Sequence, residues 1–280
     1  MSKRRYGFDE QKIQRFLKEG RGTGHSAAYK PWLTIQDISS LGRSSRIHSF
    51  KTRREHHLLS DHEAGLFLML EWSATVVDIR EQFPLEREAT RRIARELGVP
   101  HPRDPHSRVD LVMTTDFLID AKIDGGIQVH ARAVKPADKL DDGRTVQKLE
   151  IERRYWQDHG ASWALVTDQD LPKQRIRNLR WLHEMQSFDR MTAPHPDYWQ
   201  DRCQWFLASL AAVSTDMTIA RFIEQLEQSG NFRPDEALTV LRHLVSNKRV
   251  AFDLDDPFSV RWPVTRLRSL EAQPRFRGTA

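Results

Sequence analysis

Two strand-like segments carry an acidic and a basic residue in an arrangement suited to binding a metal ion and a phosphate. Asp116 lies within the run 111–119 (LVMTTDFLI), and Lys135 follows the run 127–134 (IQVHARAV). The intervening DGG segment at 124–126 is a strong hairpin signal, so the two runs are predicted to be neighbouring strands. A carboxylate is a preferred ligand of Mg²⁺, and an ammonium group can stabilise charge or orient an attacking water.

This pattern is typical of nucleases of the restriction-endonuclease class, which place an acidic residue on one strand and an acidic-x-Lys triplet on the next. Here the triplet reads Ala133-Val134-Lys135, so its usual carboxylate or amide side chain is missing. The spacing alone leaves a second interpretation open, in which Asp116 is a strand-end aspartate and Lys135 is a surface lysine.

A third candidate, Glu63, begins a predicted helix at 60–72. Ser60 and Glu63 form a capping box, S-D-H-E, in which the glutamate ordinarily caps the helix at its solvated end. Phe67 and Leu70 follow Glu63 by four and seven residues, so the carboxylate shares a helical face with the buried stripe. Glu63 is therefore either a cap or a carboxylate that reaches an interior site.

Basic residues are concentrated in the N-terminal fifth of the chain. Residues 1–59 contain 13 Lys and Arg against 5 Asp and Glu, an excess of +8 in a chain whose net charge is +5. This segment favours a phosphate-backbone partner, and a solvated basic face is the alternative. The residues that we expect to contact DNA phosphates are Arg43, Arg46, Lys51, Arg53 and Arg54.

The pattern of elements predicts two domains. Residues 1–190 read as an α/β domain with a mixed sheet and a basic N-terminal arm, in which 43–57 form extended arms and turns. Helices are expected at 13–19, 60–72, 86–97, 145–159 and 178–185, and strands at 75–83, 111–119, 127–134 and 161–167.

Residues 191–280 are predicted to form an α+β domain of winged-helix type. Three helices are expected at 199–213, 218–228 and 234–247, followed by short strands at 249–253 and 258–262. Many such domains bind DNA and a good fraction bind proteins; equal numbers of acidic and basic residues weaken the DNA interpretation.

The remaining composition excludes several classes of protein. The single cysteine, Cys203, excludes a disulfide framework and a cysteine-based zinc site, and it fits a reducing compartment. The longest apolar run, 66–70, is far shorter than the ~20 residues that a membrane span needs, and no secretory signal is recognisable. We therefore expect a cytoplasmic protein with no membrane contact. Metal binding is not expected at the histidines His25, His56, His57, His101 and His106.

Several motifs resemble the TnsA family, the endonuclease subunits of heteromeric Tns-type transposons. The resemblance runs in order and in spacing from about residue 12 to residue 160. The motifs that carry it are KEGRGTGHSAAYKPWLTIQDI, GRSSRIHS, HHLLSDHEAGLFLMLEW, DIREQFPL, TTDFLID, VKPA and LEIERRYWQ. It implies a restriction-endonuclease-like nuclease core followed by the winged-helix-like C-terminal domain.

The resemblance also assigns roles to individual residues. It implies that Glu63 and Asp116 bind the metal and that Lys135 completes the catalytic set, with the backbone carbonyl of Val134 as a further ligand. The family's glutamine two residues before the lysine falls on Ala133, a departure that puts metal affinity in question. Glu152, on the following helix, is a candidate supporting carboxylate or a solvent-facing helix residue. Mg²⁺ is the implied cofactor, and Mn²⁺ is expected to substitute.

The implied activity is Mg²⁺-dependent hydrolysis of phosphodiesters in double-stranded DNA at the 5′ ends of the transposon, on the non-transferred strand. A DDE-type transposase would act on the 3′ ends and an ATPase regulator would contact the C-terminal part, all in the bacterial cytosol or nucleoid. Two alternatives stay open: a stand-alone restriction or repair endonuclease, and a catalytically inactive DNA-binding assembly subunit.

Overall fold

The chain is organised as two compact units, Met1–Leu171 and Pro172–Ala280. The computed structural model describes residues 7–37, 43–214 and 216–270. The predicted domain boundary after residue 190 differs from this division, because the helix α5 (Lys173–His183) belongs to the second unit, where it packs against α8 (Glu236–Ser246).

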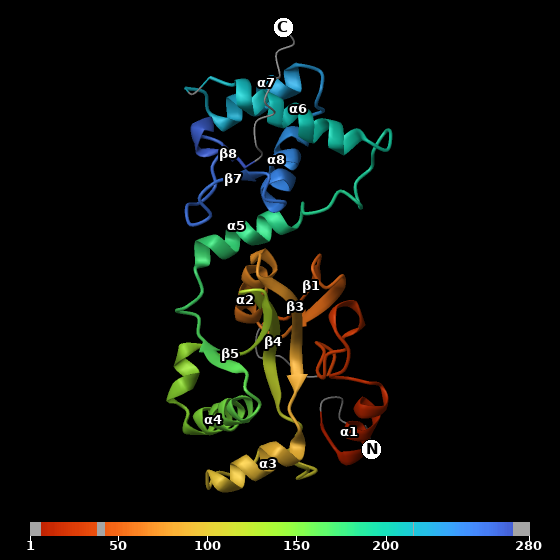
Figure 1. The fold of residues 1–280 in the computed structure, drawn as a ribbon, viewed down its shortest axis with the longest axis vertical. Coiled ribbons are helices and arrows are strands. Elements are labelled where there is room, and N and C mark those ends of the chain that lie inside the picture. The colour runs from red at the N-terminus through yellow and green to blue at the C-terminus, as the bar shows by residue number, and fades with distance from the viewer. Residues whose placement is uncertain (1–6, 38–42, 215, 271–280) are drawn as a thin grey trace. The chain divides into compact units, whose positions relative to one another are not determined.

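A four-stranded mixed sheet forms the centre of the first unit (Figure 1). The strands β3 (Val76–Pro84), β4 (Thr114–Ile123) and β5 (Gly126–Val134) form an antiparallel meander, and β6 (Ser162–Val166) pairs parallel with β5. A parallel pair needs a crossover connection, which α4 (Gly143–Asp158) supplies. The α/β mixed-sheet prediction is thereby confirmed.

The turn between β4 and β5 fixes the register of the two strands that carry the candidate residues. Asp124 and Gly125 both have positive φ, +49° and +81°, as a tight hairpin turn requires. Ile123 pairs directly with Gly126 across this turn. The hairpin expected from the DGG segment is confirmed.

Two helices pack with the sheet around a buried apolar cluster. α3 (Arg87–Glu96) contributes Ile93, and α4 contributes Ile151 and Trp156. Leu118 of β4 belongs to the same cluster. The sheet and the two helices thus form the rigid base from which the strand ends project.

The helix α2 (Asp61–Trp72) begins where the capping box predicts. Ser60 Oγ accepts a hydrogen bond from the backbone N–H of Glu63, and residues 63–68 are all buried. Successive residues of a helix point in different directions, so this run of buried positions means that protein surrounds the helix on several sides. Phe67, which is fully buried, packs on the ring of His56.

The basic segment is more ordered than the extended arms and turns predicted for 43–57. β1 (Ser45–Ser49) and β2 (Arg54–Leu58) pair as an antiparallel hairpin. Glu71 of α2 anchors its turn, because this carboxylate accepts hydrogen bonds from the backbone N–H groups of Phe50 and Lys51. Further towards the N-terminus, α1 (Glu10–Lys18) packs its buried residues against Trp32.

The second unit is built around α8. The helices α5, α6 (Tyr198–Ala212) and α7 (Ile219–Gln228) all contact it. The predicted strand at 249–253 is present as the short β7 (Val250–Ala251), but its partner is β8 (Arg268–Ser269). The strand predicted at 258–262 is wrong: the aromatic side chains there pack against Phe252 as a ring cluster.

Candidate active site

Glu63 is a buried carboxylate at the start of α2. Its Oε1 accepts a hydrogen bond from the Ser60 hydroxyl at 2.9 Å, and its Oε2 accepts one from the Leu59 backbone N–H at 3.0 Å. The residue is only 6% exposed. Glu63 therefore fulfils both sequence-based readings, since it caps the helix while its carboxylate lies inside the protein.

Asp116 of β4 meets the end of β5. Its Oδ2 accepts hydrogen bonds from the Val134 backbone N–H at 2.7 Å and from Lys135 Nζ at 2.8 Å. The ammonium of Lys135 also donates to the Val134 carbonyl oxygen at 2.8 Å, and its side chain keeps 37% of its surface exposed. The structure thus brings together the aspartate, the lysine and the carbonyl that the sequence singled out.

Gln82 of β3 joins Glu63 to Asp116, and sequence reasoning missed it. Its Nε2 lies 3.3 Å from Asp116 Oδ1 and 3.5 Å from Glu63 Oε2, and its Oε1 accepts a hydrogen bond from the Thr114 hydroxyl at 3.0 Å. The residue is 2% exposed. The signal for it in the sequence was the polar run REQ inside a strand that also contains several apolar residues.

Glu152 of α4 faces the interior, so the solvent-facing interpretation is wrong. Its Oε1 accepts hydrogen bonds from the Thr115 hydroxyl at 2.9 Å and from the Trp163 indole N–H at 3.2 Å. Thr115 is the residue that precedes Asp116 on β4. Glu152 therefore lies next to the candidate site and contributes negative charge to it.

Burial and the nearby charge of Asp116 raise the proton affinity of two glutamates. Burial and the charge of Asp116 raise the pKa of Glu63 to about 7, and the same two causes raise the pKa of Glu152 to about 7. Burial lowers the pKa of Lys135, but Asp116 and the two glutamates outweigh it, so that the pKa of Lys135 is raised. Negative charge held together in this way is typical of a site that binds a cation.

Residues 73–168 match the family "TnsA-like endonuclease N terminal", and residues 170–254 match "TnsA endonuclease C terminal". The chain is also 40% identical over 262 residues to the "Transposon Tn7 transposition protein TnsA" of Escherichia coli, covering 92% of this chain and 91% of that protein.

The chain belongs to the TnsA endonuclease family. The first family match contains Asp116, Lys135 and Glu152, and the second begins at residue 170, close to the division after Leu171. A nuclease with a restriction-endonuclease-like core generally uses a divalent metal. Among the helices that the structure describes, none is long and apolar enough to cross a membrane.

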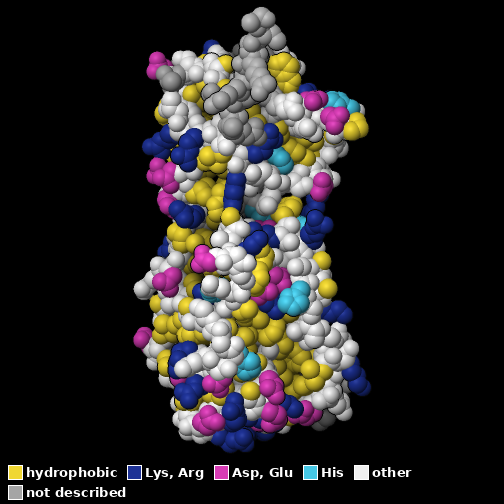
Figure 2. All heavy atoms as spheres, viewed as in Figure 1, with side chains coloured by type: hydrophobic (Ala, Val, Ile, Leu, Met, Phe, Trp, Pro, Cys, Tyr) yellow, Lys and Arg dark blue, Asp and Glu magenta, His cyan; other side chains and the backbone are white. Residues whose placement is uncertain are grey.

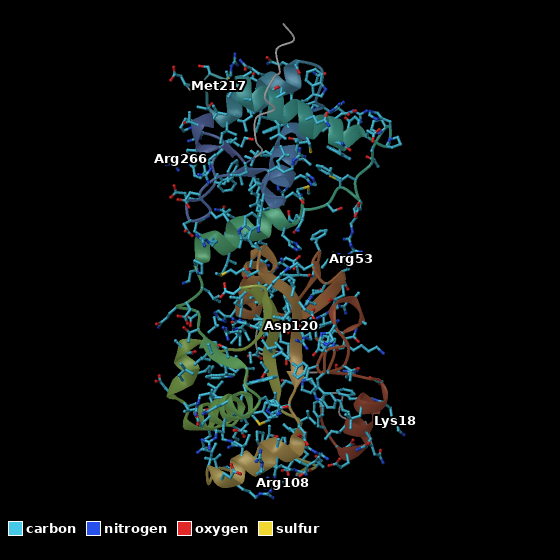
Figure 3. The ribbon with its side chains drawn as sticks, viewed as in Figure 1. Lys18, Arg53, Arg108, Asp120, Met217 and Arg266 are labelled. Carbon is cyan, nitrogen blue, oxygen red and sulfur yellow. The ribbon has the colours of Figure 1, made fainter. Side chains whose placement is uncertain are left out.

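The five basic residues predicted to contact DNA phosphates in this TnsA-family chain differ in exposure. Arg43, Arg46 and Arg53 are exposed, and Figure 3 labels Arg53 at the turn of the β1–β2 hairpin. Lys51 is half-buried at the same turn. On the face drawn in Figure 2, Lys and Arg side chains are interspersed with Asp and Glu and do not form one continuous patch.

Arg54, predicted to contact DNA, has a different role. Its Nη1 and Nη2 donate to the two carboxylate oxygens of Glu81 at 2.9 and 2.6 Å, and only 9% of its side chain is exposed. Its Nε donates to the backbone carbonyl of Ser26. The guanidinium donates its hydrogen bonds to groups inside the fold. This corrects the assignment of Arg54 as a phosphate contact.

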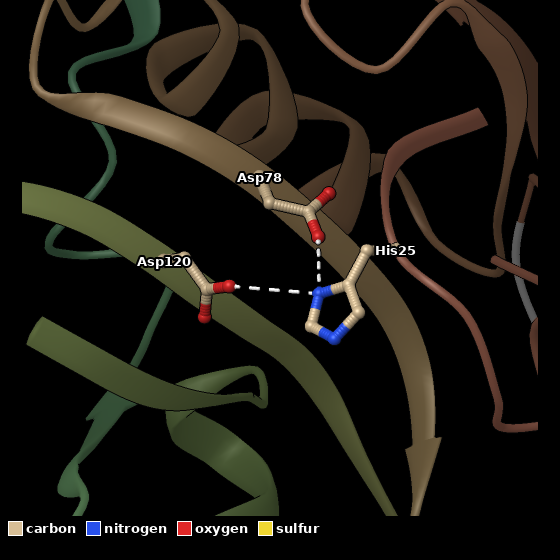
Figure 4. A group of neighbouring side chains, drawn as sticks. All are labelled: His25, Asp78 and Asp120. Carbon is tan, nitrogen blue, oxygen red and sulfur yellow. Dashed lines mark hydrogen bonds and ion pairs between the residues drawn. The ribbon is translucent and has the colours of Figure 1, made fainter. Parts of the chain in front are cut away.

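A second group of charged side chains lies further along β3 and β4 (Figure 4). His25 Nδ1 is 3.3 Å from Asp78 Oδ2 and 3.8 Å from Asp120 Oδ2. The buried guanidinium of Arg80 pairs with both aspartates. Because Arg80 already balances these carboxylates, we interpret the group as an ion-pair network that attaches the N-terminal segment to the sheet.

Proposed function

We propose that this chain is the endonuclease subunit of a transposition machinery and that it hydrolyses DNA phosphodiesters at the 5′ ends of the transposon, on the non-transferred strand. The observation that carries the proposal is the convergence of Glu63, Asp116 and Lys135 from α2, β4 and β5. Membership of the TnsA endonuclease family and the similarity to a transposition protein support it.

The donor set fits Mg²⁺, with Mn²⁺ as a substitute. Glu63, Asp116 and the Val134 carbonyl offer hard oxygen ligands, and both carboxylates approach one point, where Gln82 Nε2 lies. We propose that these three residues hold the ion. When bound, it would screen the phosphate charge and make water more acidic.

Three residues of the chain contribute to the reaction through their charge and position. Lys135 keeps its proton, because Asp116 raises its pKa, and its partly exposed side chain can donate to a phosphate oxygen. With a pKa of about 7, Glu63 loses its proton near neutral pH, and its carboxylate would then be able to hold the metal. Glu152 supports the site through Thr115, the neighbour of Asp116 on β4.

Partners complete the proposal. We infer that the substrate is double-stranded DNA at the transposon ends, that a DDE-type transposase acts on the 3′ ends, and that an ATPase regulator contacts the C-terminal unit. The setting is the bacterial cytosol or nucleoid. Ala133 lacks a ligand side chain and so suggests an inactive assembly subunit as the alternative. The assembled Glu63, Asp116 and Lys135 favour an active nuclease.

The test is an end-cleavage assay with the full-length chain, its partner transposase and transposon-end DNA whose two strands carry different labels. We expect breaks at the 5′ end of the non-transferred strand with Mg²⁺ or Mn²⁺ and none with EDTA. Glu63→Gln should abolish these breaks and leave cutting at the 3′ ends intact. The matched control is Glu88→Gln on α3, whose carboxylate is 69% exposed.

Two outcomes would contradict the proposal. Breaks that persist in EDTA would remove the metal from the mechanism, and unchanged 5′ cleavage by Glu63→Gln would remove Glu63 from the site. Efficient cleavage of plasmid DNA by the chain alone would favour the stand-alone endonuclease instead.

The exposed arginines give a separate prediction. Replacing Arg43, Arg46 and Arg53 by glutamine should weaken DNA binding and reduce the slope of log K against log salt by about 2–3, since each phosphate contact contributes about 0.9. Fluorescence anisotropy at several salt concentrations measures this slope. A triple variant at the exposed residues Lys18, Arg92 and Arg95 is the control, and an unchanged slope in the first variant would assign the three arginines to a solvated face.

A further inference from the structure

The side chain of Gln82 occupies the point where the two candidate metal-binding carboxylates converge. Its Nε2 lies within 3.5 Å of one oxygen from each carboxylate. An amide NH₂ group has two donors and a partial positive charge, so it bridges two anions where a cation would otherwise lie. A cation that binds Glu63 Oε2 and Asp116 Oδ1 together must therefore displace this nitrogen.

The surroundings of Gln82 allow its amide to rotate by a half-turn and keep a hydrogen bond to Thr114. Its Oε1 accepts from the Thr114 hydroxyl at 3.0 Å. A hydroxyl both donates and accepts, so after a half-turn of the amide Thr114 would accept from Nε2. The same rotation would direct Oε1, a hard neutral oxygen, at the point between the carboxylates.

The residue on β5 from which a further ligand is expected supplies none. Ala133 is fully buried two residues before Lys135, and its methyl group has no donor atom. Mg²⁺ favours six oxygen ligands in octahedral geometry. Gln82 is the buried polar side chain that contacts both Glu63 and Asp116, and it adds a ligand without adding charge.

The backbone of Gln82 is held in an unfavourable conformation. Its φ is +47°, in the left-handed region that glycine adopts freely and other residues rarely do. Its carbonyl accepts a hydrogen bond from the Trp32 N–H at 3.2 Å, which holds this conformation in place. Conformations of this kind persist at functional sites when the surrounding structure determines them.

We propose that Gln82 is itself a ligand of the divalent cation, and that its amide rotates on binding so that Oε1 replaces Nε2 between Glu63 and Asp116. In the metal-free protein the amide joins the two carboxylates, and in the metal-bound protein it joins the coordination shell in place of the side chain missing at Ala133. This inference rests on the proposed metal-dependent function.

The test measures Mn²⁺ binding to the full-length protein by calorimetry and by electron paramagnetic resonance, with no DNA present. Gln82→Met removes the amide at similar volume, and Gln82→Gly removes it while suiting the positive φ. We expect both to weaken Mn²⁺ binding by at least about tenfold. Gln82→Glu keeps an oxygen at this place and should bind at least as tightly as the native chain. Gln128→Met, at an exposed position on β5, is the control.

The sign of the change separates a ligand from a bridging group. If the amide only bridges the carboxylates, it competes with the cation, and Gln82→Met and Gln82→Gly would bind Mn²⁺ equally well or more tightly. That result, or a loss of affinity in Gln82→Glu equal to that in Gln82→Met, would overturn the inference. Asp116→Asn tests the proposed function separately: binding that survives this substitution would place the metal elsewhere, whatever the Gln82 variants do.

Discussion

Asp116→Asn is expected to reduce the cleavage rate by about 10³-fold or more while leaving the protein folded. The asparagine has the same shape, but it has no negative charge with which to bind a cation or to pair with the Lys135 ammonium. Removing a single charge-stabilising or catalytic group from an enzyme's active site reduces the rate by about 10²- to 10⁶-fold. Single-turnover cleavage of end-labelled DNA with the partner transposase measures the rate.

Stability should change little in the same variant, because two effects oppose each other. Asp116 raises the pKa of both Glu63 and Glu152, so its removal relieves repulsion between buried carboxylates. The Lys135 ammonium, in turn, loses its ion-pair partner. We expect a thermal midpoint within a few degrees of the native chain at pH 8. The control is Asp124→Asn in the exposed β4–β5 turn, where asparagine tolerates the positive φ. Cleavage by Asp116→Asn at near the native rate would contradict the site.

The second large effect concerns stability: Glu81→Gln should lower the free energy of unfolding by about 3 kcal/mol at pH 7. Glu81 is fully buried, where it pairs with Arg54 and lies 2.8 Å from His56 Nδ1. Burial raises the pKa of Glu81, but His56 and Arg54 lower it more, to about 2. The substitution leaves the buried Arg54 without its charged partner.

The pH dependence of this effect has a definite sign. A carboxyl whose pKa is lower in the folded protein stabilises it above the unfolded pKa, and this contribution disappears as the pH falls through the folded pKa. The difference between the native chain and Glu81→Gln should therefore be full above about pH 4.5 and shrink steadily towards pH 2. Urea unfolding at several pH values measures it. The exposed Glu55→Gln should cost less than about 1 kcal/mol, and a loss that small for Glu81→Gln would refute the role assigned to the pair.

Local sequence signals predicted the elements of the fold well where the signal was itself local. The capping box at Ser60 and Glu63 and the turn at 124–126 act over three or four residues, and both are confirmed. The strand predicted at 258–262 rested on residue type alone. Its aromatic residues pack against one another instead of forming a strand. β propensity does not indicate whether a partner strand is available.

The candidate site also shows that local signals do not predict contacts between residues distant in sequence. Residue type and spacing made Glu63, Asp116 and Lys135 candidates, and the family resemblance assigned their roles. Gln82 and Arg54 depend on contacts distant in sequence. Arg54 is separated by 27 residues from Glu81, the partner that buries it. A count of charges cannot distinguish an arginine inside the protein from one on its surface. Gln82 becomes noticeable only when β3 is placed beside β4 and the start of α2.

The division after Leu171 has a consequence for how such chains diverge during evolution. Each residue of the candidate site, and each hydrogen-bond partner described for it from Leu59 to Trp163, precedes this point. Recombination between related genes at this point would exchange the whole C-terminal unit without replacing a residue of the site. Selection can therefore alter the second unit while the residues of the candidate site in the first are inherited unchanged.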